Sequence, residues 1–305
     1  MTRRPPKNIA ASVRQRLLIK ARETRRPFSE LLQYFAMERF LYRLSKSQYA
    51  DNFVLKGALM LTVWEAPLTR PTMDIDLLGR IDNSIETIVE VTREICRQEV
   101  EPDRIDFDIA TVEAERIAED ADYEGIRVRF RGSLDTARIV MQLDIGFGDI
   151  VIPSPEPTNY PTLLDLPSPH LRGYSRESTI AEKFEAMVKL GILNSRMKDF
   201  FDIWLMLRQF DFEGPILAEA ISKTFFTRAT NIQSEPLALT NSFAEDAAKA
   251  AQWRGFIRRN RIENAPQNLI EVVTAIDAFL GPIAKSLASG HVFKATWKAP
   301  GPWRK

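Results

Sequence analysis

Apolar residues recur every three or four positions in the first and last thirds of the chain, which predicts helices there. Residues 8–24 and 28–46 have this spacing, as a helix with one buried face requires. The same pattern predicts helices over 84–98, 178–193 and 197–209, and most of the chain beyond them has helical character. Helical segments therefore flank a central part with a different pattern.

The central part alternates apolar and polar residues, which predicts strands. Residues 105–110, 126–130 and 139–145 each follow this two-residue period. The segment 53–60 is apolar with a glycine in it, which indicates a strand, a tight turn and the start of a helix, and the apolar run around 74–78 predicts a further strand. We expect an α/β (α+β) fold with a small mixed sheet.

Six prolines lie between Ile152 and Pro169, which predicts a stiff, extended crossover that joins two lobes and is not a packed element. The tail beyond Gly290 is expected to be loosely held. The chain is accordingly divided into an N-terminal helical segment (1–48), a core with the sheet (49–170) and a C-terminal helical domain (171–305).

Composition limits the classes of protein that fit. The 305 residues are 45% hydrophobic, enough for a sizeable core, and 42 basic residues balance 41 acidic ones, so net charge gives no general attraction to nucleic acid or membrane. The single cysteine, Cys96, excludes an internal disulfide and fits a reducing compartment. There is no secretory signal and no apolar run near the roughly 20 residues that cross a bilayer, so a cytoplasmic protein without a membrane partner is expected.

The most informative polar residues are Asp74 and Asp76, which stand two residues apart in an apolar run. In a strand this spacing directs both carboxylates to one face, where each disfavours ionisation of the other. A divalent cation relieves that repulsion, and Mg²⁺ is bound by one or two carboxylates together with nucleotide phosphates. The alternative is a solvated strand face or turn, with a basic side chain or helix N-terminus nearby. Asp144 becomes a third ligand if its predicted strand lies beside that of Asp74.

The helix predicted to begin at a Ser178 cap carries a second set of charges. Lys183 shares its apolar face, which indicates a charged partner or a phosphate, or else a lysine that reaches from a helix boundary to solvent. Asp199 and Asp202 are three residues apart on a helix that is apolar around most of its circumference. The helix dipole is a sufficient explanation for Asp199.

Four segments together resemble the AbiEii/AbiGii toxin family, the nucleotidyltransferase-like toxins of type IV toxin–antitoxin and phage abortive-infection systems. They are Leu55-Lys56-Gly57-Ala58-Leu59, Arg70-Pro71-Thr72-Met73-Asp74-Ile75-Asp76, Ile180-Ala181-Glu182-Lys183 and Arg196-Met197-Lys198-Asp199-Phe200-Phe201-Asp202. The resemblance covers about residues 50–210. It implies a DNA polymerase β-like nucleotidyltransferase core and a helical lobe, with Mg²⁺ and a nucleoside triphosphate (NTP) bound between them.

The resemblance also implies roles for individual residues. Those expected to be catalytic are Asp74, Asp76, Lys183 and Asp199. Those expected to contact the nucleotide are Lys56, Gly57, Thr72 and Lys183. The expected metal ligands are Asp74 and Asp76, with Asp144 added from its predicted strand. The implied reaction is two-metal nucleotidyl transfer, in which Lys183 offsets phosphate charge.

The implied partners are a cognate antitoxin, usually encoded alongside, and RNA, since the acceptor in the family, where known, is the 3′ end of tRNA. Two other functions remain open: nucleotidyl transfer to a small molecule or protein, and a catalytically silent nucleotide-binding protein. Gly57-Ala58 favours the silent protein, because Ala58 lacks the hydroxyl common at that position. The densest basic cluster comprises Arg254, Arg258, Arg259 and Arg261, which either contacts an RNA backbone or forms a solvated helix face.

Overall fold

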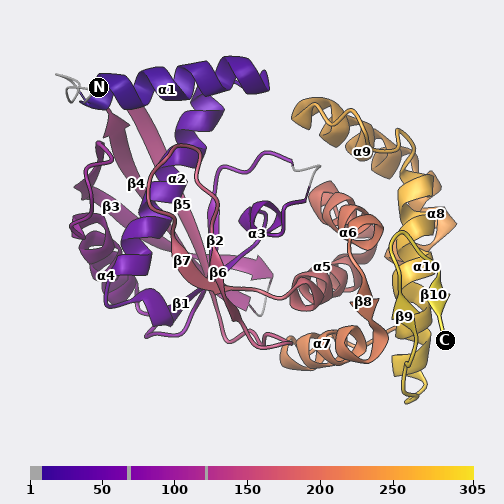
Figure 1. Ribbon diagram of the computed structural model, residues 1–305. Coiled ribbons are helices and arrows are strands. Elements are labelled where there is room, and N and C mark those ends of the chain that lie inside the picture. The colour runs from indigo at the N-terminus through magenta and orange to yellow at the C-terminus, as the bar shows by residue number, and fades with distance from the viewer. Residues whose placement is uncertain (1–8, 67–69, 121–122) are drawn as a thin grey trace. The chain divides into compact units, whose positions relative to one another are not determined.

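The computed structural model describes residues 9–66, 70–120 and 123–305, and they form two compact units (Figure 1). The sheet unit comprises residues 1–65, 71–148 and 156–173. The helical unit comprises residues 66–70, 149–155 and 174–305. The predicted division at residues 48 and 170 stays a prediction. The chain passes between the units more than once, and Arg70 belongs to the helical unit although Pro71 belongs to the sheet unit.

The sheet unit is built on a seven-stranded sheet with the order β3-β4-β5-β2-β1-β7-β6. The strands are β1 (Phe53–Lys56), β2 (Ile75–Gly79), β3 (Ile105–Asp120), β4 (Tyr123–Leu134), β5 (Ala137–Phe147), β6 (Glu156–Asn159) and β7 (His170–Gly173). β2 pairs with β5 and β1 pairs with β7 in parallel, while the other neighbours are antiparallel. The expected mixed α/β fold is confirmed.

Helices cover one face of this sheet, and charged side chains lie on the opposite face. The helices of the unit are α1 (Ile9–Thr24), α2 (Phe28–Lys46), α3 (Leu59–Val63) and α4 (Ile85–Arg97), with a 3₁₀ turn η1 (Ala50–Asn52). α2 and α4 contact each other and the strands, and Phe40 of α2 packs against Phe107 and Phe130 at 6.0 and 5.5 Å between ring centroids. Because side chains alternate along a strand, this packing fixes which residues face away from the helices.

The helical unit packs its elements around α6 and α10. Its helices are α5 (Arg176–Leu190), α6 (Met197–Gln209), α7 (Gly214–Thr227), α8 (Asn241–Glu245), α9 (Ala247–Asn260) and α10 (Leu269–Ala288), with 3₁₀ turns η2 (Gly191–Leu193) and η3 (Leu237–Leu239). α6 buries ten of its eleven residues from Met197 to Leu207, all except Lys198. In the part of the chain that the structure describes, no helix is both long and apolar enough to cross a membrane.

Three expectations about the last half of the chain are wrong. The proline-rich segment contains β6, which pairs with β7 and is an edge strand, where proline costs no interstrand hydrogen bond. The tail contains β9 (Thr296–Trp297) and β10 (Trp303–Arg304), which form a small sheet with β8 (Phe212–Glu213). α5 is capped by Ser175 and not by Ser178, whose hydroxyl instead accepts a hydrogen bond from the amide of Ile152.

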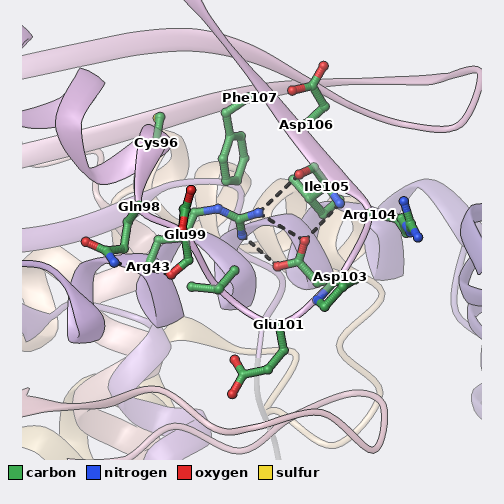
Figure 2. Close-up of a pocket in the computed structure, with 12 residues that line it drawn as sticks. Arg43, Cys96, Gln98, Glu99, Glu101, Asp103, Arg104, Ile105, Asp106 and Phe107 are labelled. Atoms are coloured by element: carbon green, nitrogen blue, oxygen red, sulfur yellow. Dashed lines mark hydrogen bonds and ion pairs between the residues drawn. The ribbon is translucent and has the colours of Figure 1, made fainter.

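α2 also carries charged side chains into the sheet unit. Arg43 donates to both carboxylate oxygens of Asp103, at 2.6 and 3.0 Å, and to the carbonyl of Ile105 beside a surface pocket of about 440 Å³ (Figure 2). Glu38 is fully buried, and burial raises the pKa of its carboxyl to about 7 against the opposing effect of Arg39. The guanidinium of Arg39 lies 2.8 Å from Glu38 Oε1 and forms an ion pair with it.

Candidate functional site

The turn after β1 brings the main chain against the side chain of Asp76. Gly57 has φ +72°, a conformation that a Cβ disfavours, and a Cβ at this position would lie 2.6 Å from Cγ of Asp76. Lys56, immediately before the turn, is the register partner of Asp76 on β2. A glycine is required here both for the backbone conformation and because the carboxylate occupies the space of a side chain.

Asp76 and Asp144 stand side by side on the open face of the sheet. β2 and β5 are parallel neighbours, and their register pairs Asp76 with Asp144, so both side chains point to the same face. The predicted strand of Asp144 therefore does lie beside that of Asp76. Next in the row, Arg127 on β4 donates two hydrogen bonds of 2.8 and 2.7 Å to the two oxygens of Asp144.

Asp74 lies just before β2 and belongs to the same charged surface. The hydrogen bonds to Asp144 raise the pKa of Arg127, and the nearby charge of Asp74 acts in the same direction. The segment that leads to Asp74 is held from α2: the amide of Thr72 donates to the hydroxyl of Tyr34 at 3.0 Å, and the Gln33 amide donates to the Met73 carbonyl at 3.3 Å. The position of Asp74 thus depends on α2 as well as on β2.

The carboxylates of this surface suit a magnesium ion in kind and number. Asp74 and Asp76 offer oxygen donors only, and Mg²⁺ needs one or two protein carboxylates when substrate phosphates complete its coordination. Over residues 9–66, 70–120 and 123–305, however, no group of three His, Cys, Asp or Glu side chains is arranged to hold a metal ion. Asp144 as the third ligand stays a prediction, and it requires the bidentate bond to Arg127 to open.

A buried cluster of four charged side chains lies in the helical unit. The ammonium of Lys183 on α5 is 2.8 Å from Asp199 Oδ1 and 2.9 Å from Asp202 Oδ2, both on α6. Arg70 donates two hydrogen bonds of 2.9 Å to the carboxylate of Asp202. The cluster contains two positive and two negative groups, and the Asp202 side chain, 1% exposed, contacts both cations.

The charges in this cluster stabilise one another against the cost of burial. Burial disfavours the ammonium, but Asp199 and then Asp202 outweigh it and raise the pKa of Lys183. Burial likewise disfavours the carboxylate of Asp202, but Arg70 and Lys183 lower its pKa to about 2. Lys183 and Asp202 are therefore ionised at neutral pH, and each stabilises the charge of the other.

A second network fixes the orientation of the helix that carries Lys183. Arg228, at the end of α7, donates to Asp149 at 3.0 Å and to Glu185 of α5 at 3.1 Å, and lies 3.4 Å from Glu182. The hydroxyl of Tyr174 donates to Glu182 at 2.6 Å. Because Glu182 directly precedes Lys183, these contacts restrain the side of α5 from which the lysine projects.

Residues 39–280 match AbiEii, described as the nucleotidyl transferase AbiEii toxin of a type IV toxin–antitoxin system. The chain belongs to the AbiEii family. It is thus a member of a family of nucleotidyltransferase toxins, and the match includes both the open carboxylate surface and the buried cluster.

Two solved structures are similar to this AbiEii chain, both at low sequence identity. A candidate nucleotidyltransferase from H. pylori is 16% identical, with a TM-score of 0.46, and the match covers 85% of this chain and 95% of that one. JHP933 from Helicobacter pylori is 15% identical, with a TM-score of 0.45, and the match covers 86% and 92%. No curated protein matches the chain.

The predicted site residues of the AbiEii chain fall into two groups. Lys56, Gly57, Thr72, Asp74, Asp76 and Asp144 are in the sheet unit, and Lys183 and Asp199 are in the helical unit. Sequence reasoning missed Arg127, Arg70 and the central place of Asp202 in its cluster. An arginine at the start of the Asp74 motif was visible in the sequence, but its partner lies 132 residues away and no spacing rule connects them.

Proposed function

We propose that this chain is a Mg²⁺-dependent nucleotidyltransferase toxin that transfers a nucleoside monophosphate from an NTP to RNA, with the 3′ end of tRNA as acceptor. We further propose that a cognate antitoxin, encoded alongside, neutralises it. The family supplies the reaction class, and the open carboxylate surface supports it in this chain.

The observation that carries the proposal is the contact of Asp76 with the main chain at Gly57. Gly57 is favoured by its positive φ and also leaves space for a carboxylate, and this second requirement comes from the site and not from the apolar core. Asp144 in register beside Asp76, and Asp74 two residues before it, add acids at a place where repulsion alone would disfavour them. Such an arrangement fits the binding of a cation and a phosphate.

Individual side chains would have distinct tasks in this reaction. Asp74 and Asp76 would hold Mg²⁺, which when bound supplies positive charge to the triphosphate and activates the attacking hydroxyl. Arg127 orients Asp144 at the edge of the same surface. Of the three N–H donors of Lys183, two are directed to Asp199 and Asp202, and we propose that the third binds a phosphate oxygen.

The direct test is incubation of the purified protein with Mg²⁺, total tRNA and each labelled NTP in turn. We expect label at the RNA 3′ end with one or more nucleotides, and none with Asp74→Ala. Asp106→Ala is a matched control, because Asp106 is an exposed acid on β3 of the same sheet. Label that survives Asp74→Ala, or that is lost equally in the control, contradicts the assignment of the carboxylate surface.

One observation favours the alternative of a catalytically silent nucleotide-binding protein. Lys183 is already neutralised by two carboxylates, which lowers the attraction that it exerts on a phosphate. A silent protein binds NTP with Mg²⁺ in calorimetry yet labels no acceptor, and its toxicity in a growth assay is unchanged by Asp74→Ala. Label that appears on a small molecule or a protein, and not on RNA, would instead mean that this molecule is the acceptor.

A further inference from the structure

The exposed face of α9 carries cations and no acids. Residues 247–262 include Arg254, Arg258, Arg259 and Arg261 but no Asp or Glu, in a chain whose net charge is only +1. All four arginines are exposed, and none of them forms an ion pair with any described residue. A cluster of unpaired guanidinium groups creates a local positive potential at the surface.

Small residues lie between the arginines on the same face of α9. Opposite the buried Trp253 and Ile257, α9 presents Ala247, Ala251 and Gly255 between the arginines. A Cβ at Gly255 would meet nothing within 4 Å, so no neighbour in the protein requires a glycine there. Glycine in the middle of a helix is destabilising relative to alanine. The fold alone therefore gives no reason for this residue, whereas a partner that approaches the helix backbone closely does.

α9 packs directly against α6, the helix that holds Asp199 and Asp202. Phe256 of α9 lies 5.9 Å from Phe201 of α6 between ring centroids. Lys249, in the first turn of α9, is buried and donates to the carbonyl of Asn194 just before α6 at 2.9 Å. The arginine face thus belongs to a helix anchored beside the cluster of Lys183.

We infer that the exposed face of α9 binds the phosphate backbone of the RNA acceptor. This inference rests on the proposed function, because it assigns a surface to that RNA. Guanidinium groups form paired hydrogen bonds with phosphate oxygens, and Ala247, Ala251 and Gly255 leave room for a backbone to lie close to the helix. Recognition of this kind is independent of base sequence and leaves selection of the acceptor to other contacts.

The first test measures binding of fluorescently labelled total tRNA to the full chain over a series of KCl concentrations. Replacement of Arg254, Arg258 and Arg259 by Gln should weaken binding at low salt at least about tenfold and reduce the slope of log K against log salt by about two. The matched control removes three cations, Arg16, Lys20 and Arg22, from α1 and should leave the slope unchanged. Equal effects of the two triple variants, or no effect of the α9 variant, would overturn the inference.

Gly255→Gln provides a second measurement without a change of charge. The variant should fold with an unchanged or higher Tm, because Gln is a better helix former and has open space around it. It should nevertheless weaken tRNA binding by roughly threefold or more through steric exclusion of the backbone. Unchanged affinity with a raised Tm would mean that α9 is a solvated helix face and would overturn the inference.

The two proposals fail in distinguishable ways. If wild-type protein labels tRNA while the α9 variants keep the wild-type KM for tRNA, the RNA surface is wrong and the transferase stands. If tRNA binds through α9 but no NTP labels it, the surface stands and the proposed acceptor chemistry is wrong. Competition by phosphatidylglycerol vesicles as effective as that by unlabelled tRNA would make α9 a membrane-facing helix and overturn the RNA assignment.

Discussion

The two units of the molecule treat charged side chains in opposite ways. In the sheet unit, Asp74, Asp76 and Asp144 are only half-buried and stand close together on one face. In the helical unit, Asp199 and Asp202 are buried, and their charges are matched by Lys183, which is 14% exposed, and by Arg70. Like charges gathered at a surface cost stability and are retained for what they bind, whereas matched charges in a core hold their own neighbours in place. Substitutions in the two places should therefore have different consequences.

The contrast between the charged groups of the two units is tested most strongly by Asp74→Ala. We expect nucleotidyl transfer to fall at least about 10²- to 10³-fold, the loss seen when a group that stabilises transition-state charge is removed. The free energy of unfolding should change by less than about 1 kcal/mol, since the substitution relieves repulsion at a half-buried position. Activity assays and urea denaturation of the same preparation check both parts. A large loss of stability would show that this acid is structural.

The opposite outcome is expected for Asp202→Ala. Its removal leaves Arg70 without its carboxylate partner and Lys183 with Asp199 alone, which should cost about 3–5 kcal/mol in the free energy of unfolding. Glu90→Ala is the control, because Glu90 pairs with Arg97 at the surface and its loss should cost no more than about 1 kcal/mol. Chemical denaturation measures both, and similar losses in the two variants would refute the assignment of the buried cluster to structure.

Glu38 sharpens the comparison because it is a buried carboxylate within the sheet unit. Its pKa is about 7 in the folded chain and 4.5 in the unfolded chain. Between these pH values the native state keeps a proton that the unfolded state has released, so stability should fall by roughly 3 kcal/mol as pH rises from 4.5 to 7. Glu38→Gln should remove this slope in urea denaturation series. If stability falls with pH as steeply in the variant, a group other than Glu38 causes the pH dependence.

The smallest expected effect separates backbone strain from displacement of Asp76. Gly57→Ala and Gly148→Ala both place a Cβ at positive φ, which costs about 1–2 kcal/mol of stability. Only at Gly57 does the new Cβ displace a carboxylate, whereas at Gly148 it meets nothing within 4 Å. Steady-state kinetics should therefore show a lower kcat for the Gly57 variant alone. Equal kcat values would mean that the position of Asp76 is unimportant.

Local patterns in the sequence were sufficient for the carboxylate surface but not for its partners. Alternation located the strands, and the two-residue spacing of Asp74 and Asp76 placed both on one face. The hydrogen bonds from Arg127 to Asp144 depend on the register of the β4–β5 hairpin. Alternation of apolar and polar residues determines which face a side chain is on, but the register can shift by two residues without changing that face. The proline-rich segment was misjudged because proline is tolerated in an edge strand such as β6, and the sequence does not reveal which strand is at the edge.

The buried cluster was predicted only in part. Helical spacing put Lys183 on an inner face, and the family resemblance pointed to Asp199. The attachment of Arg70 to Asp202 depends on tertiary contacts between residues far apart in the chain, for which a single sequence contains no signal. The tail was expected to be loose, but Trp303 stacks on Phe279 at 5.4 Å between ring centroids and Trp297 is almost wholly buried.

The tail has a practical consequence for spectroscopy. Four of the five tryptophans (Trp204, Trp253, Trp297 and Trp303) are in the helical unit, whereas five of the six tyrosines are in the sheet unit. Emission excited selectively at tryptophan will therefore report mainly on the helical unit, and tyrosine absorbance mainly on the sheet unit. One unlabelled sample thus carries two intrinsic optical probes, and melting curves recorded with both will reveal whether the units lose their structure together or in turn.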